Sequence, residues 1–260
     1  MENPVTEQQG GTVTIVSDDL AKFAGMGMEG ADANDFAIPF AHILQKLSPQ
    51  VDEDSPTRIE GAKSGQIFIT TTGQRLDGKV GFLVIPCAFK KNMVEWKPRT
   101  SGGGYVKEHA WNGELIAQCQ KNDKNQNVLP NGNLLVETKM HYVLVKGDDG
   151  WFPAVITMTS TQLKKSRKWM ALLGNRKLKT ADGKSFIPPS FAFYYHLTTI
   201  MESNDSGTWY NWEIEPKDQV NDATLIRDAI KFHKAVNAGE VKVVDNSPSL
   251  QAADDDDIPF

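Results

Sequence analysis

Between Gly65 and about Ile214 the chain is a succession of short apolar or alternating runs bounded by turn residues, and this pattern restricts it to a β-rich fold. Asp149-Gly150 separates two alternating runs, and Gly102-Gly103 separates two others, so each pair predicts a β-hairpin. Residues 120–133 are polar and predict a loop. We expect strands at 66–70, 80–86, 93–97, 104–107, 114–119, 139–145, 152–158, 191–201 and 207–214, and a further short β-like run at 12–16.

Three segments change to helical spacing, at 36–47, 162–173 and 221–238. Gly174 and Gly239 follow the second and third segments as expected helix ends. The order is several strands, a helix, two more strands and a terminal helix. An OB-fold-like five-stranded barrel, with its helix between strands three and four and with added helices, accepts this order. A β-sandwich or another α+β sheet accepts it too.

Composition sets the limits of the domain organisation. With 260 residues the chain is long enough for one large domain or two small ones. Residues 1–35 are rich in Gly, Asp, Glu and Thr and predict a poorly ordered acidic extension. Residues 36–239 predict the folded domain, and residues 240–260 a disordered acidic tail. Apolar stretches are far shorter than the ~20 residues of a membrane span, no secretory signal is visible, and two cysteines suit a reducing cytoplasm.

The net charge of −5 conceals a strong asymmetry. Residues 1–57 hold 2 basic and 10 acidic residues, residues 58–187 hold 21 and 10, and residues 188–260 hold 5 and 13. A basic middle therefore lies between two acidic ends. Such a field attracts polyanions, for which the acidic ends can compete.

The basic middle also carries aromatic residues, and single-stranded nucleic acid is bound by positive grooves with rings on which bases stack. A first cluster surrounds the expected Gly-rich hairpin, and a second holds seven basic residues within 16 positions of the 162–173 helix and its end. The candidate DNA-binding residues are Lys90, Lys91, Trp96, Lys97, Arg99, Tyr105, Lys107, Trp111, Lys164, Lys165, Arg167, Lys168, Trp169, Arg176 and Lys177.

The chain ends in four consecutive aspartates followed by Ile-Pro-Phe. An apolar terminal residue with a free carboxylate, behind a repelling acidic run, suits capture by a partner with an apolar pocket and a basic rim. The candidate partner-binding residues are Asp254, Asp255, Asp256, Asp257, Ile258, Pro259 and Phe260.

This tip resembles the C-terminal tip of single-stranded DNA-binding proteins from bacteria and their phages. The body, with stretches such as 43–50 and 95–99, is more similar to tailed-phage replication-module proteins. The resemblance implies recruitment of replication, repair and recombination proteins through the tip, in the cytoplasm of a bacterial host.

No phosphate-binding loop, nucleophile elbow or zinc-ligand spacing is present, so the sequence predicts no enzyme activity, no cofactor and no metal. We therefore expect a non-enzymatic protein that binds single-stranded DNA with little sequence preference. A strand-annealing recombination protein, a nuclease accessory and a replisome adaptor that does not bind DNA are the alternatives. The oligomeric state is left open.

Overall fold

A computed structural model of the chain describes residues 22–23, 26–30, 38–205, 207–241 and 243. The chain divides into residues 1–36 and residues 37–260, and the elements below belong to the second unit. The expected strand at 12–16 and the tip at 254–260 lie outside the described residues. Within the described part of the chain, no helix is both long and apolar enough to cross a bilayer.

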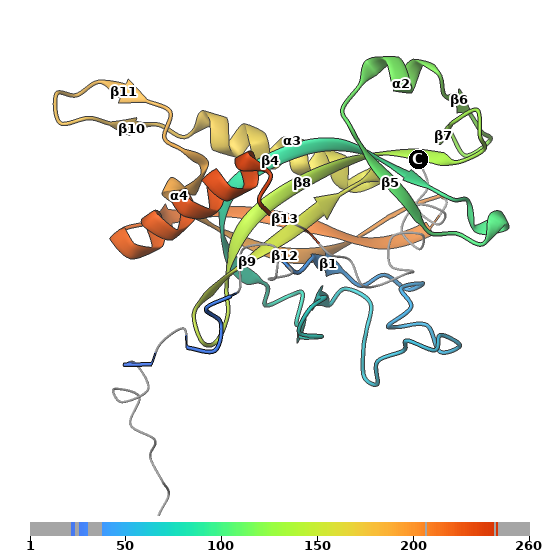
Figure 1. Cartoon of the computed structure of the whole chain (residues 1–260), viewed down its shortest axis with the longest axis horizontal. Helices are drawn as coiled ribbons and strands as arrows, with labels where there is room; N and C mark the ends of the chain where they lie inside the picture. The colour runs from blue at the N-terminus through green and yellow to red at the C-terminus, as the bar shows by residue number, and fades with distance from the viewer. Residues whose placement is uncertain (1–21, 24–25, 31–37, 206, 242, 244–260) are drawn as a thin grey trace, which may run out of the picture. The chain divides into compact units, whose positions relative to one another are not determined.

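The main sheet is antiparallel and curls into a half-barrel (Figure 1). Its central strands follow the order β13-β12-β4-β8, and β9 pairs with β8. These strands are β4 (Phe82–Trp96), β8 (Leu134–Lys146), β9 (Trp151–Met158), β12 (Phe193–Asn204) and β13 (Gly207–Gln219). The chain is therefore β-rich, and its sheet is consistent with an OB-like fold.

Smaller elements decorate this sheet. β5 (Tyr105–Ala110) pairs with the end of β4, and β1 (Ala41–Ile43), β2 (Ile67–Ile69) and β3 (Arg75–Leu76) form a second sheet. The others are β6 (Gln120–Lys121), β7 (Asn127–Val128), β10 (Leu178–Lys179), β11 (Ser185–Phe186) and the 3₁₀ turns η1 (Arg99–Ser101), η2 (Ser160–Gln162) and η3 (Ser190–Ala192).

The hairpins expected from turn residues are confirmed. β8 and β9 pair from Lys139↔Met158 to Lys146↔Trp151, and the Gly147 amide donates to the Gly150 carbonyl across the turn at 2.7 Å. Gly150 has a φ of 136°, which residues with side chains rarely adopt. β12 pairs with β13 down to Asn204↔Gly207, and β4 pairs with β5 around the Gly-rich turn.

The 80–86 and 93–97 runs, expected as separate strands, belong to one 15-residue strand, β4. Proline has no N–H for a sheet ladder and is found in strands mainly at edges or bulges. The register of β4 against β8 shifts between Pro86 and Ala88, so a bulge accommodates Pro86 and the strand continues.

Two expected elements are wrong. Residues 36–47 were expected to form a helix, but the described part holds β1, which pairs with β2. The Val155 amide donates to the Pro39 carbonyl at 2.9 Å, so pairing with distant strands outweighs the local spacing. Residues 114–119 were expected to form a strand, but α2 (Gly113–Ala117) is a short helix, because Asn112 caps it by accepting from the Glu114 amide.

Two apolar clusters lie on the two sides of the main sheet. One joins Val84, Val143, Ile156 and Trp212 with β1 and β2, and Trp169 of α3 (Leu163–Asn175) packs into it. The other lies under α4 (Ala223–Ala238). Both helices correspond to expected ones. α4 begins at the Asp222 cap and ends at Gly239 with a φ of 76°, whereas α3 continues through Gly174.

Candidate nucleic-acid interface

Alternation along β4 divides the first predicted cluster between the two faces of the sheet. β4 pairs with β8 without a shift from Ala88 to Trp96, so successive side chains point to opposite faces. Lys90 and Trp96 therefore share one face, and Lys91 lies on the other. In the ladder between β4 and β5, Trp96 pairs with Tyr105, and their rings meet edge to face with centroids 5.6 Å apart.

On the face opposite Trp96, Lys91 and Lys139 lie directly across from each other in the β4–β8 ladder. Their Nζ atoms are 3.9 and 3.8 Å from the same Glu137 carboxylate oxygen. Arg167 of α3 is close enough to act electrostatically on Lys139. We call Lys91, Lys139 and Arg167 the cationic ridge. It joins the two predicted basic clusters through Lys139, a residue that the sequence reasoning missed.

The cationic ridge concentrates positive charge at a cost. Like charges directly opposite in a sheet destabilise it. Burial lowers the pKa of Lys139; Glu137 opposes this effect, while Arg167 and Lys91 lower the pKa further. Lys91 and Lys139 share the Glu137 carboxylate and Arg167 lies near Lys139, so positive charge is in excess here and an anionic ligand would neutralise it.

Trp111 extends the ridge with an aromatic ring. The Lys91 ammonium lies 2.9 Å from the centroid of the indole, a cation–π contact. Trp111 is 40% exposed, so part of its ring remains open to solvent. A cationic group and a partly exposed aromatic ring therefore lie side by side, which is the combination that single-strand-binding proteins use.

Three basic residues of the second cluster bind the protein itself. The Lys165 Nζ lies 2.8 Å from Glu202 and 3.4 Å from Glu213, and the Lys168 Nζ lies 2.5 Å from Glu213. Arg176 donates to the Lys217 carbonyl at 2.8 Å and covers the Phe193 ring. These contacts fasten α3 and its end to the β12–β13 hairpin. The acidic partners are far away in sequence, so spacing along the chain gave no sign of them.

Trp169 is fully buried and cannot offer a face to a base in this structure. Its indole stacks on the His141 ring with centroids 4.5 Å apart. Burial, and secondarily Lys139, lowers the pKa of His141 to about 3, so this imidazole is neutral at neutral pH. Trp169 is therefore a core residue, and its prediction as a DNA-binding residue, which rested on the four basic residues beside it in the sequence, is wrong in this structure.

The remaining predicted residues lie on the surface or at its edge. Lys97, Lys107, Lys164 and Lys177 are exposed. The Lys107 Nζ lies 4.0 Å from the Glu95 carboxylate. The backbone of Arg99 lies in η1, and its side chain is not among the described groups.

Glu95 anchors the connection between β5 and β8. Glu95 is 3% exposed, and its carboxylate accepts from Asn131 at 2.9 Å and Asn133 at 2.6 Å and lies 2.8 Å from His109 Nε2. Burial alone would raise the pKa of Glu95, but hydrogen bonds from Asn133, Asn131 and His109 and the charge of Lys107 hold it at about 2. The loop behind Trp111 is thereby held by an ionised, buried carboxylate, which no sequence motif indicated.

Comparison with known proteins identifies the family of the chain. No curated protein and no solved structure matches the chain. The profile of a family described as Pam3 phage gp34-like protein matches residues 8–242, which is most of the chain. The chain therefore belongs to the Pam3 phage gp34-like protein family.

Proposed function

We propose that this phage-family protein binds single-stranded DNA without strong sequence preference and recruits replication and recombination proteins through its acidic C-terminal tip. The observation that carries the proposal is the cationic ridge with Trp111 beside it. A sheet that sets two lysines opposite each other, near an arginine and an open indole ring, is suited to phosphates and bases.

The architecture supports the same proposal. If β4, β8, β9, β12 and β13 are read as five strands in chain order, α3 falls between the third and the fourth. This is the order of an OB-fold, in which strands two and three and the loops after strands one and four bind oligonucleotides. In this numbering, Lys91 of the ridge lies in strand one, Lys139 in strand two and Arg167 in the helix. Trp111 lies in the connection after strand one.

The tip supports the recruiting half of the proposal. Asp254–Phe260 has the acidic run and the terminal Ile-Pro-Phe of single-stranded DNA-binding proteins. A basic surface and an acidic tail on one chain attract each other, so DNA that occupies the ridge would release the tail to partners in the host cytoplasm. Removal of residues 254–260 should therefore raise DNA affinity at low salt.

The decisive experiment measures binding of a labelled oligo-dT by fluorescence anisotropy over a range of salt concentrations. Affinity should fall with salt by a log–log slope of about −0.7 for each phosphate neutralised. Arg167→Gln and Lys91→Gln should each make this slope shallower by about 0.7. Lys217→Gln is the matched control, because this partly exposed lysine pairs with Glu215 at 2.8 Å outside the ridge, and it should bind as the wild type does.

Each outcome separates the alternatives. If the wild type binds DNA but both ridge variants bind equally well, the interface lies elsewhere. If the wild type shows no affinity at low salt, the protein is an adaptor and the proposal is wrong. Accelerated annealing of complementary strands, or metal-dependent degradation of DNA, would replace the proposal by one of the other two alternatives.

A further inference from the structure

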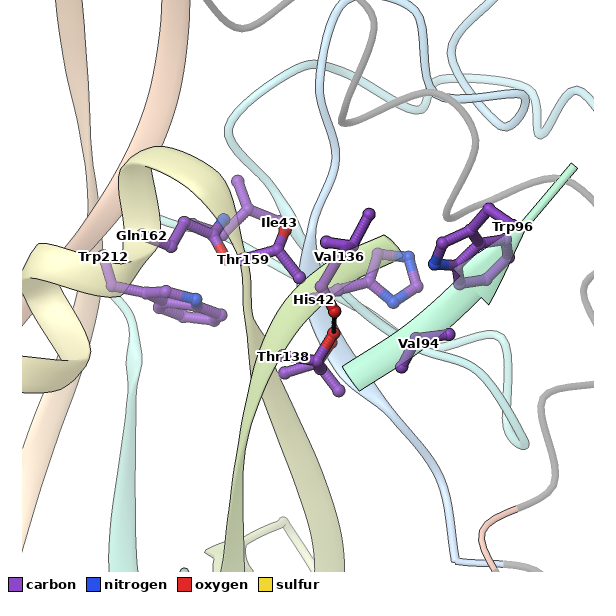
Figure 2. A pocket seen from close by; sticks show the side chains of 10 residues that line it. His42, Ile43, Val94, Trp96, Val136, Thr138, Thr159, Gln162 and Trp212 are labelled. Atoms are coloured by element: carbon purple, nitrogen blue, oxygen red, sulfur yellow. Dashed lines mark hydrogen bonds between the residues drawn. The ribbon is translucent and has the colours of Figure 1, made fainter. Parts of the chain in front are cut away.

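A small cavity opens between the end of the β4–β8 pair, β1 and the start of α3 (Figure 2). Ten residues line it, and Figure 2 shows Trp212 at one end, Trp96 at the other and His42 between them. Trp212 is fully buried, whereas Trp96 is partly exposed, so the cavity is accessible from the Trp96 end. Its volume is about 50 Å³.

Two residues that line the cavity carry buried polar atoms without partners among the described residues. Trp212 Nε1 and His42 Nε2 are both buried, and neither has a hydrogen-bond partner among the described residues. An unpaired buried donor costs about 1–3 kcal/mol, so such groups are usually satisfied by a ligand or by water. Thr138, Thr157, Thr159 and Gln162 add hydroxyl and amide groups to the lining.

The cavity is polar but uncharged. Its lining includes no Lys, Arg, Asp or Glu. Burial lowers the pKa of His42 to about 4, so its ring is neutral at neutral pH and can donate from one nitrogen and accept at the other. Ile43, Val94 and Val136 form apolar walls. A phosphate or another ion would therefore be excluded, and a neutral, flat group with hydrogen-bonding edges would fit.

The volume limits this group to one ring. A buried water needs roughly 10–15 Å³ by this measure, so the cavity accepts about four waters or a planar group of similar bulk. That bulk matches a single six-membered ring better than the two fused rings of a purine. Trp96 at the open end offers an aromatic face against which a planar ring can stack.

We propose that this cavity takes one unstacked pyrimidine base from the bound single strand, with Trp96 at the entrance and the Trp212 indole N–H and His42 as hydrogen-bonding groups inside. The inference rests on the proposed function and adds to it a base-selective position. Lys91 and Val94 point to opposite faces of β4, so the strand would pass around the β4–β8 pair between ridge and cavity.

The test is a scan with otherwise uniform oligo-dT in which a single position is replaced by adenine or by an abasic site. Two neutral hydrogen bonds correspond to roughly tenfold in affinity. We therefore expect one position where either replacement weakens binding by about tenfold, while neighbouring positions tolerate it. Val136→Phe, which fills the cavity, should abolish the difference between positions. Val80→Phe is the matched control, because Val80 is 70% exposed and does not line the cavity.

A second measurement is made on the wild-type protein and does not depend on the folding of Val136→Phe. The Trp212 indole N–H resonance, assigned with Trp212→Phe, should shift when saturating oligo-dT is added to the wild-type protein. Salt-dependent DNA binding with equal tolerance at every position and an unmoved Trp212 signal would overturn the pocket and leave the proposed function standing. Absence of DNA binding would overturn both.

Discussion

Replacement of Glu95 by glutamine removes the buried charge that holds the loop between β5 and β8. The carboxylate receives Asn131, Asn133 and His109, and its pKa falls from 4.5 to about 2. Each pKa unit corresponds to 1.36 kcal/mol, so ionisation of Glu95 contributes about 3 kcal/mol to folding at pH 7. Glutamine keeps the size of the side chain but loses this contribution.

The pH dependence distinguishes this explanation from a packing defect. Because the folded pKa is below the unfolded value, the contribution is complete above about pH 5 and declines as pH falls through 4.5 toward 2. At pH 3 we expect the difference between wild type and Glu95→Gln to shrink to about 1 kcal/mol.

Urea denaturation, followed by tryptophan fluorescence at several pH values, measures this difference. Glu215→Gln is a suitable control, since that exposed carboxylate contacts Lys217 and its loss should change stability much less. A difference that stays constant from pH 7 to pH 3, or that is below about 0.5 kcal/mol at pH 7, would refute the reasoning.

Two further substitutions test the fold. Trp169→Leu should lower the free energy of unfolding by roughly 2–4 kcal/mol, because it leaves a cavity at a fully buried position, and should not change the salt dependence of oligo-dT binding. A shallower salt dependence without a loss of stability would indicate that Trp169 contacts DNA. Gly81→Ala should lower the melting temperature, because Gly81 has a φ of 67° and a Cβ there would collide with the Leu197 carbonyl oxygen. A melting temperature equal to that of the wild type would contradict this close approach of Gly81 to β12.

Sequence reasoning succeeded where the determining interactions are local. Asp149-Gly150 specifies its hairpin within a few residues, and Gly239 marks the end of α4, whose expected start at residue 221 lies two residues before the observed one. It failed where a distant partner decides the outcome. β1 exists because β2 offers a ladder, and no helical spacing within residues 36–47 contains that information.

The same distinction applies to the candidate site. A sequence shows which residues are basic but not which acidic residues they pair with. Lys165, Arg167 and Lys168 were therefore equally good candidates for DNA binding. Only the fold shows that two of them form ion pairs with Glu202 and Glu213. Conversely, Lys139 stands within an apolar strand pattern, and its position opposite Lys91 follows from register alone.

β4 runs as one strand from Phe82 to the hairpin at Trp96, with a bulge at the proline within it. Its 15 residues span about 50 Å, and β8 pairs with it over most of that length. The ladder between the two strands is disrupted only at the register shift between Pro86 and Ala88. A bulge bends its strand and increases the local twist, so the bulge at Pro86 sets the direction in which the Trp96 end of β4 leaves the core.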